Sequence, residues 1–383
     1  MRYSETAKFC KKCGRYTYAH KLGTSPEIIG HLIMDELTVS VEIDDALIEA
    51  CRPFDYDFDG KSTFILPRFD APKRDGTWSI GLICGPSGSG KTQLLKREYG
   101  VTKPPKWDGK KAIVSQVRPE CLSAVGLNTV PSWCRPYHVL SNGEQYRADL
   151  ARMIADNTAI DEFTSVVDRN VAKSCAYALQ RYIRSSGING VVLSSCHTDI
   201  IEWLSPDWVF DTAQAKVSPR GADRRPSIAI DIHECGGEWW GLFKDHHYLS
   251  ETMNKSAKCF LGKINGETVC FGSVLAFPNQ HFKSAFREHR TVVLPDFQGL
   301  GVGVRFSDAV AQHYVNNGSR FFSKTAHPRM GEYRERSPLW RGTSKNRKAR
   351  LDYTIDRNTK ERKYKDAHIN RVCFSHEYIG GAA

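Results

Sequence analysis

The alternation of hydrophobic and polar residues predicts strands and helices in both halves of the chain. Nearly continuous apolar runs at 78–84 and 191–197 are typical of strands buried on both faces. Alternating residues at 227–235 and across 255–278 predict strands with one buried face, and the latter segment contains an Ile-Asn-Gly-Glu hairpin turn. A glycine-rich turn at 294–303 precedes a helical pattern of about twelve residues that ends at Asn-Asn-Gly. Strands mixed with helices in this way predict an α/β protein.

Changes in composition divide the chain into domains. A chain of 383 residues exceeds one ordinary core, which favours two domains. Residues 213–227 are rich in Pro, Gly, Arg and Ser, as linkers are. We therefore expect a small lead-in at 1–58, a first domain at 59–212 that opens with a strand at 62–69, this linker, and a second domain at 228–383.

The overall composition is that of a soluble globular protein, with 40% hydrophobic and 25% charged residues. No stretch approaches the roughly 20 apolar residues that a membrane span requires, and the first residues lack the apolar core of a secretion signal. The twelve cysteines show no disulfide-framework spacing, so we expect them to be thiols. These features predict a cytoplasmic protein with no membrane partner.

Positive charge is concentrated in one stretch near the end of the chain. Residues 320–371 contain 16 Lys/Arg and 6 Asp/Glu, which is nearly all of the net charge of +11. Six aromatic residues are interleaved with these charges: Phe321, Phe322, Tyr333, Trp340, Tyr353 and Tyr364. Arginines for phosphates and aromatic rings for bases are the combination that nucleic-acid-binding proteins use. A solvated surface, an acidic protein substrate or the phosphates of CoA would also account for the charge.

A phosphate-binding loop follows the first apolar strand. The segment GPSGSGKT matches G-x-x-x-x-G-K-T, with a strand before it and an amphipathic helix after it. The glycines let backbone N–H groups turn toward phosphate oxygens, Lys91 adds a positive charge, and the Thr92 hydroxyl can ligate Mg²⁺. The helix that begins here adds its positive end. The predicted nucleotide-binding residues are Gly85, Pro86, Ser87, Gly88, Ser89, Gly90, Lys91 and Thr92.

Further segments resemble the motifs of ABC-type ATPases, in the order that this family has. The segment LSNGEQYRADLARMI at 140–154 is similar to the ABC signature loop and its helix. The resemblance implies that Ser141 and Gly143 reach the γ-phosphate of ATP bound by a second subunit, so that two copies form a homodimer around ATP. It also implies that Phe64 or Phe69 stacks on the adenine.

The catalytic motifs of that family are matched at three further places. AIDEFTSVVD at 159–168 resembles a Walker B strand and D-loop, which implies that Asp161 holds Mg²⁺ and Glu162 orients or deprotonates the attacking water. His197 matches the switch histidine, Asp168 closes the D-loop, and Gln116, after an expected strand at 111–115, matches the Q-loop glutamine.

The resemblance covers about 60–212 and has departures. Only 24 residues separate Gln116 from Ser141, so the helical subdomain is short. The segment before Asp161 is less apolar than a Walker B strand, and Asn142 and Glu144 stand where small residues are commoner.

The second glycine loop, LPDFQGLGVG, lacks the Lys-Thr of a nucleotide-hydrolysing loop and the spacing of a Rossmann loop. Its Q-x-x-G-x-G resembles the acetyl-CoA motif of the GNAT acyltransferases, which also place a hairpin before the motif strand. The resemblance implies a GNAT-like α+β domain with a central mixed sheet, whose motif strand splays from its neighbour. Backbone N–H groups would hold the CoA pyrophosphate, and the N–H of Val293 or Leu294 would polarise the thioester carbonyl. The predicted residues are Val293, Leu294, Gln298, Gly299, Leu300, Gly301, Val302 and Gly303.

Three residues are candidates for proton transfer in the second domain. Attack on a thioester requires a neutral amine and a protonated leaving thiol, hence a base and an acid. Glu288 and His289 lie on the strand before the loop, where family bases often lie, and Tyr333 follows the next strand, where the family often has its acid. A surface carboxylate, a strand-end histidine and an aromatic nucleic-acid contact are the alternatives.

The lead-in contains Cys10-Lys-Lys-Cys13-Gly, which is half of a zinc-binding motif. His20, His31 and Cys51 are the local candidates for the other half, and reduced thiols in a basic turn are the alternative. Cys10 and Cys13 are therefore candidate ligands of a structural Zn²⁺.

Together these features predict an ABC-type ATPase domain fused to a GNAT-like N-acyltransferase domain, with ATP, Mg²⁺ and acetyl-CoA or another acyl-CoA as cofactors. Nucleic acid, bound through 320–371, is the expected partner, and the combination faintly resembles the Mom-type phage enzymes that modify adenine in DNA. Two other hypotheses stay open. In the first, the protein is a nucleic-acid-binding ATPase whose second domain is a non-catalytic recognition module. In the second, the protein is an ATP-gated acetyltransferase that acts on protein or tRNA.

Overall fold

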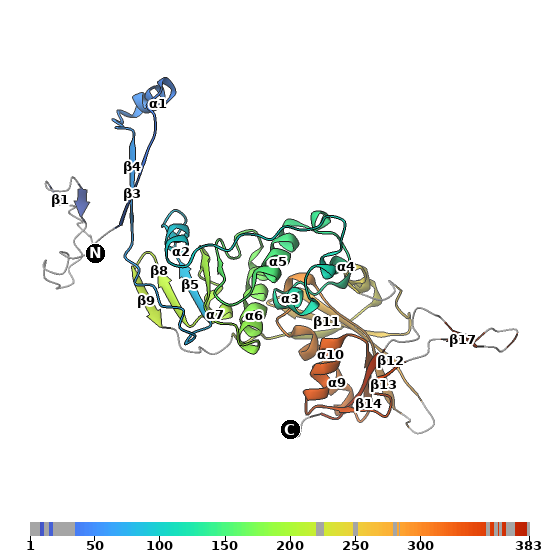
Figure 1. Ribbon diagram of the computed structural model, residues 1–383. Coiled ribbons are helices and arrows are strands. Elements are labelled where there is room, and N and C mark those ends of the chain that lie inside the picture. Colours follow the sequence, from blue (N-terminus) through green and yellow to red (C-terminus); the bar gives the residue numbers. More distant parts are fainter. Residues whose placement is uncertain are drawn as a thin grey trace, which may run out of the picture. The chain divides into compact units, whose positions relative to one another are not determined.

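The computed structural model describes most of the chain and divides it into two compact units, Met1–Asp70 and Ala71–Ala383. The described residues are 8–10, 15–17, 35–219, 226–247, 252–278, 282, 284–349, 353–355, 359, 362–364 and 372–380. The second unit contains both the phosphate loop and the second glycine loop (Figure 1).

The first unit contains two small antiparallel sheets, β1 with β2 and β3 with β4. A short helix, α1, lies between β3 and β4, and the Asp44 carboxylate caps it by accepting the Leu47 N–H at 2.8 Å. The strand expected at 62–69 is therefore present as β4, and it pairs with β3. The elements are β1 (Lys8–Cys10), β2 (Arg15–Thr17), β3 (Asp35–Ser40), α1 (Asp45–Cys51), η2 (Arg52–Phe54) and β4 (Lys61–Leu66).

The first half of the second unit is built on a five-stranded sheet of order β6-β7-β5-β8-β9. The strands β6, β7, β5 and β8 are parallel and β9 is antiparallel at the edge. All residues of β5 and β7 are buried, as their apolar runs predicted. The strands are β5 (Ile80–Cys84), β6 (Ala159–Ile160), β7 (Val191–Ser195), β8 (Trp208–Asp211) and β9 (Lys216–Pro219).

Helices cover this sheet, and the longest is α6. Its buried Cys175, Leu179 and Ile183 recur every four residues and pack into the same core as Leu82 and Leu193 of β5 and β7. The helices and 3-10 turns are α2 (Lys91–Tyr99), η3 (Ile113–Ser115), α3 (Pro119–Ala124), α4 (Val130–Trp133), η4 (Tyr137–Val139), α5 (Asn142–Met153), α6 (Arg169–Ser185) and α7 (Ile201–Leu204).

The strand expected at 111–115 is wrong, because these residues form the 3-10 turn η3. The N–H groups of Ser115 and Gln116 donate to carbonyls three residues earlier, at 3.1 and 2.9 Å. Ala112 forms only an isolated bridge with Pro136. Local hydrogen bonds thus replace the strand ladder that the apolar pattern suggested.

The second half of the unit is built on a mixed eight-stranded sheet of order β10-β11-β12-β13-β14-β19-β15, with β16 paired to β19. Pairing is antiparallel throughout this sheet except between β13 and β14. The predicted hairpin is confirmed as β11–β12, with Asn265 and Gly266 at φ of 51° and 82° in its turn. The strands are β10 (Asp231–Cys235), β11 (Lys258–Ile264), β12 (Glu267–Ala276), β13 (Ala285–Val293), β14 (Arg320–Thr325), β15 (Trp340–Gly342), β16 (Lys348–Ala349) and β19 (Val372–Tyr378). A separate pair is β17 (Tyr353–Ile355) with β18 (Arg362–Tyr364).

Two helices flank the parallel pair of strands in this half. The expected helix after the glycine loop is confirmed as α9, and Phe306 and Val310 on it pack into a core with Phe260 of β11. The second helix, α10, follows β14 (Figure 1). The helices and turns are η5 (Gly237–Trp239), α8 (Trp240–Phe243), η6 (Lys244–His246), η7 (Pro295–Phe297), α9 (Val302–Asn316) and α10 (Pro328–Arg336).

Candidate functional site

The phosphate loop joins the carboxyl end of β5 to the start of α2. Gly85, Gly88 and Gly90 have φ of 149°, 75° and 87°, conformations that side chains disfavour. A Cβ at Gly85 would lie 1.8 Å from Thr212 Oγ1, so this position also requires glycine for space. Lys91 is 6% exposed, and its ammonium donates to the Gly85 and Pro86 carbonyls at 3.0 and 2.7 Å. Two backbone carbonyls of the loop therefore fix the position of the Lys91 ammonium, beside the N-terminus of α2.

The two predicted carboxylates of the Walker B segment lie at the same edge of the sheet as the phosphate loop. Asp161 and Glu162 directly follow β6, and β6, β7 and β5 are neighbouring parallel strands. The hydroxyl of Ser194, on β7, donates to Asp161 Oδ1 and accepts the Glu162 N–H at 3.1 Å. Since carboxyl ends of parallel strands meet at one edge, Thr92, Asp161 and Glu162 belong to one functional edge. These are the hard oxygen donors that Mg²⁺ prefers.

His197 lies just beyond β7 and contacts the loop after Glu162. Its Nδ1 is 3.3 Å from Thr164 Oγ1, and Thr164 has a φ of 70°. Partial burial and then the charge of Arg169 lower the pKa of His197, so the ring is neutral at pH 7. Asp168 caps α6, where its carboxylate accepts the N–H groups of the second and third following residues at 2.8 and 3.0 Å.

The predicted signature loop forms the start of α5. Ser141 and Glu144 form a reciprocal capping box, in which the Ser141 N–H donates to Glu144 Oε2 at 3.0 Å. Glu144 also accepts a hydrogen bond from Ser132 at 2.6 Å. The Gly143 carbonyl accepts from Arg147, whose side chain is 5% exposed and also donates to the Gly126 carbonyl. Within one chain, Ser141 therefore begins a helix, and its contact with ATP of a second subunit stays a prediction.

The side chain of Gln116 contacts a loop of its own chain. Its Oε1 accepts the Asp108 N–H at 2.9 Å, and its Nε2 donates to the Asp108 and Lys111 carbonyls at 3.0 and 3.2 Å. In this arrangement the amide positions the loop at 108–111, and a role at the nucleotide stays a prediction.

The second glycine loop follows the end of β13, the strand that separates from β14 along its length. The two strands pair only over Ala285–Arg287, so the later part of β13 splays from β14, as the resemblance implied. A register shift against β12 leaves His289 as the additional residue of a β-bulge. Gln298 Nε2 donates to the Val293 carbonyl at 2.9 Å, which turns the loop back onto the strand. The loop ends at Gly301, which precedes α9 with a φ of 81°.

A cavity of about 560 Å³ opens beside this loop, which is in the size range of sites for organic ligands. Six of the eight predicted CoA-binding residues line it: Val293, Gln298, Gly299, Gly301, Val302 and Gly303. Leu294 and Leu300 instead pack against the hydrophobic core, and the Leu294 N–H donates to the Val269 carbonyl at 2.9 Å. Since N–H and C=O of one strand residue point to the same edge, the Val293 carbonyl bonded to Gln298 places the Val293 N–H at the open edge of β13.

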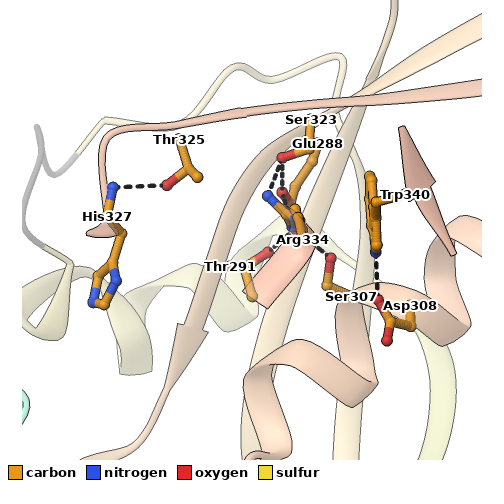
Figure 2. A network of polar contacts seen from close by, with 9 residues as sticks. All are labelled: Glu288, Thr291, Ser307, Asp308, Ser323, Thr325, His327, Arg334 and Trp340. Carbon is orange, nitrogen blue, oxygen red and sulfur yellow. Dashed lines mark hydrogen bonds and ion pairs between the residues drawn. The ribbon is translucent and has the colours of Figure 1, made fainter. Parts of the chain in front are cut away.

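All three candidates for proton transfer line the cavity, and Glu288 is at the centre of a polar network (Figure 2). Its carboxylate accepts hydroxyl hydrogen bonds from Thr291, Ser307 and Ser323 at 2.7, 2.9 and 2.6 Å. Arg334, 1% exposed, forms an ion pair with it at 2.7 Å. Burial acts to raise the pKa of Glu288, but the Arg334 charge and the hydroxyl donors outweigh it and lower the pKa. This environment favours a permanently ionised carboxylate.

Sequence patterns did not single out Arg334, because it is one of many arginines in a charged run. Its guanidinium lies over the Trp340 ring at 4.4 Å and donates to Ser307 at 2.8 Å in addition to Glu288. A charged group on α10 thus connects β13, α9 and β14 from inside the domain (Figure 2).

His289 and Tyr333 differ from Glu288 in having fewer internal contacts. His289 Nε2 accepts the Asn254 N–H at 3.3 Å, and burial, followed by the charges of Arg290 and Arg287, lowers its pKa to about 4. The Tyr333 hydroxyl donates to Asp308 at 2.5 Å, and burial together with this carboxylate raises its pKa to about 12. At pH 7 the imidazole is therefore neutral and the phenol protonated.

The structure changes the interpretation of the basic stretch at 320–371. Phe321 and Trp340 are 1% and 5% exposed, so these two rings form the core and are not available to stack on bases. Several of its arginines are neutralised by glutamates. The pairs are Arg320–Glu377, Arg334–Glu288, Arg341–Glu377 and Arg347–Glu335. Tyr353 and Tyr364 lie on β17 and β18. Internal ion pairs therefore account for part of the charge excess.

The candidate zinc site lies mostly outside the described residues. Cys10 ends β1, whereas Cys13, His20 and His31 are not among the described residues. Within the described part of the chain, no cluster of three or more His, Cys, Asp or Glu side chains forms a metal site. Zinc binding therefore stays a prediction. No helix among the described residues has the length and apolar character that a bilayer crossing needs.

No protein-family model and no curated protein matches the sequence. Among solved structures, the dimeric post-hydrolysis ATP-binding cassette MJ0796 bound to ADP and Pi is 15% identical, covers 49% of this chain and 98% of its own, and has a TM-score of 0.34. A GNAT family acetyltransferase from Elizabethkingia anophelis with acetyl-CoA bound is 16% identical (39% and 97% covered, TM-score 0.27). The ribosomal-protein-S18-alanine N-acetyltransferase from Escherichia coli is 14% identical (40% and 97% covered, TM-score 0.29).

The strand orders and loops define the two folds of the second unit. The first half is an α/β fold, in which a mostly parallel sheet carries a phosphate loop after β5. The second half is an α+β fold, in which a mixed sheet has parallel strands that splay before a glycine loop. These are the element orders that the resemblance to ABC-type ATPases and GNAT acyltransferases implied for the two halves.

Proposed function

We propose that this protein binds and hydrolyses ATP in its first half and transfers an acyl group from acyl-CoA to an amine in its second. The observation that carries the proposal is the cavity beside the splayed strand β13. It brings the glycine loop, the open edge of Val293, the neutral His289 and the protonated Tyr333 to one place.

In the ATPase half, the phosphate loop would hold the triphosphate through its backbone N–H groups and Lys91. Mg²⁺, when bound, neutralises developing charge on the phosphates, and Thr92 and Asp161 are the residues that would hold it. Glu162 would orient or deprotonate the attacking water, with His197 beside it.

A homodimer is the assembly that completes this site. In-line phosphoryl transfer needs donors around all γ-phosphate oxygens, whereas a phosphate loop covers one side. Ser141 and Gly143 of a second copy would cover the other side, so ATP would close the dimer and hydrolysis would open it.

In the acyltransferase half, the amine nitrogen attacks the thioester carbonyl carbon, a C–N bond forms and the C–S bond breaks. The Val293 N–H would stabilise the negative carbonyl oxygen of the transition state. His289, which lines the cavity and is neutral at pH 7, is the candidate base that would take the amine proton. The Tyr333 hydroxyl, which donates to Asp308 in this structure, would turn its hydrogen to the leaving sulfur, give up that proton and recover one from solvent.

The acyl acceptor is the open part of the function, and labelled acetyl-CoA tests it. The full chain would be incubated with labelled acetyl-CoA and with DNA, tRNA or protein, and the macromolecule that carries label identifies the acceptor. Nucleic acid stays our proposed acceptor because basic residues of 320–371 remain beside those that form ion pairs.

The matched variant for this assay is Tyr333→Phe, which keeps the ring and removes the acid. We expect transfer to fall about 100-fold while acetyl-CoA binding, measured by calorimetry, is unchanged. If wild-type protein bound no acetyl-CoA, the acyltransferase proposal would be overturned, and a non-catalytic GNAT fold would replace it.

A further inference from the structure

The cavity beside the second glycine loop is not built by the GNAT-like half alone. Residues of the ATPase half form part of its wall: Ser123, Ala124, Asn128, Ala178, Arg181 and Tyr182. The first three lie on or just after α3, and the last three lie on one face of α6. Both halves of the unit therefore enclose the same space.

The glycine loop itself rests on these ATPase-half elements. A Cβ at Gly299, where φ is 99°, would lie 3.1 Å from the Ala178 Cβ of α6. A Cβ at Gly126, where φ is 78°, would lie 3.3 Å from the Gln298 carbonyl oxygen. The preceding turn, η7, also packs against α6. Both positions favour glycine because their φ values are positive and because an added Cβ would lie close to an atom of the facing segment. The loop that would bind pyrophosphate therefore packs directly against the other half.

Positive charge from both halves meets at this wall. Arg181 of α6 and Arg329 of α10 both line the cavity, and Arg329 donates to Asn128 across the junction at 2.9 Å. Burial, followed by the positive charge of Arg181, lowers the pKa of Arg329. Glu120 and Glu332 offset this only in part, and Glu288 is already paired with Arg334. A bound anion would offset this positive charge.

We propose that acyl-CoA binds in a composite site, in which the glycine loop holds the pyrophosphate and Arg181 of the ATPase half, with Arg329, binds the 3′-phosphate of CoA. This inference rests on the proposed use of acyl-CoA. CoA carries two separate anionic groups, and the cavity offers a backbone N–H loop and an arginine pair for them. Arginine suits a phosphate because its planar donors bind two oxygens at once.

The composite site gives the ATPase half a direct contact with the acyl donor. The helix α6 has 17 residues, which corresponds to about 25 Å. It begins at Asp168, the predicted D-loop residue, and Arg181 lies on its last turns. Burial, followed by the negative charge of Asp168, raises the pKa of Asp296 on η7. The start of α6 therefore lies near the same glycine-loop segment. One rigid element therefore connects the Walker B loop with the acyl-CoA cavity.

The test compares acetyl-CoA with its 3′-dephospho analogue on the full chain, by calorimetry. In Arg181→Gln we expect acetyl-CoA to bind about 10- to 100-fold more weakly, because a hydrogen-bonded charge pair is lost. Binding of the dephospho analogue should be the same in wild type and variant. The control is Arg184→Gln on the same helix, since Arg184 donates to the Ser205 carbonyl and Asp207 and is not part of the cavity wall. Thermal unfolding and ATP hydrolysis establish that both variants are folded.

The outcomes separate this inference from the function on which it rests. Equal acetyl-CoA affinity in wild type and Arg181→Gln overturns the composite site and leaves the acyltransferase proposal standing. Equal weakening for acetyl-CoA and the dephospho analogue overturns the 3′-phosphate contact. Absence of acetyl-CoA binding by the wild type overturns the proposed function itself.

Discussion

The buried ion pair between Glu288 and Arg334 leads to a sharp prediction for Glu288→Gln. The Arg334 side chain is 1% exposed and the Glu288 side chain is 13% exposed, and the two charged groups are 2.7 Å apart. The Glu288 carboxylate also accepts three hydrogen bonds from hydroxyl groups. The substitution keeps the shape of the side chain but leaves the guanidinium buried without its counter-charge. Breaking a buried pair in this way costs about 3–5 kcal/mol of unfolding free energy. For a domain of this size, the melting temperature should fall by roughly 6–20 °C.

The assay combines thermal unfolding with the rate of acyl transfer at a low temperature. A double variant, Glu288→Gln with Arg334→Met, should lose less stability than the sum of the two single variants, because the second change removes the uncompensated charge. The pH dependence has a defined sign. Since folding lowers the pKa of Glu288, its stabilisation is present above the unfolded value of about 4.5 and is lost as pH falls through the folded value.

A different result would identify Glu288 as the catalytic base. If Glu288→Gln changed the unfolding free energy by less than about 0.5 kcal/mol while the transfer rate fell at least 100-fold, the structural role would be refuted. Loss of the acidic limb of the pH–rate profile would support the same conclusion.

Three other predictions concern the rest of the molecule. Glu162→Gln should slow ATP hydrolysis and accumulate an ATP-bound dimer, which sedimentation would detect. If this variant hydrolysed ATP at the wild-type rate and formed no dimer, the Walker B assignment would be wrong. Burial lowers the pKa of both His247 and His289 to about 4, so the unfolded chain binds more protons between pH 6.5 and 4. Stability to urea should therefore fall by about 1–3 kcal/mol across that window, and less so in His247→Phe. Coupling through α6 should make ATP change acetyl-CoA affinity by the same factor as acetyl-CoA changes ATP affinity, between roughly 5- and 150-fold. Independent binding would show that α6 does not transmit the state of the ATP site.

Elements whose signal is local could be predicted from the sequence. The phosphate loop, the hairpin at Asn265–Gly266 and the second glycine loop depend on residues that are neighbours in the chain, where glycine position and apolar period specify the backbone directly. The buried strands β5 and β7 were equally visible, because five consecutive apolar or small residues leave a strand few alternatives to burial. These features were sufficient to predict both folds.

Tertiary structure decided what depends on contacts between distant segments. The 111–115 segment is as apolar as a strand, but it lacks a partner ladder along its length and forms a 3-10 turn. Arg334 resembles its charged neighbours in sequence, yet it lies 46 positions along the chain from the glutamate that allows its burial. From the sequence, the second glycine loop was expected to belong to the second domain alone. The tertiary structure shows that α6 of the first half of this unit packs against the loop and lines the same cavity. Such a contact between distant segments leaves no periodic signal in either segment.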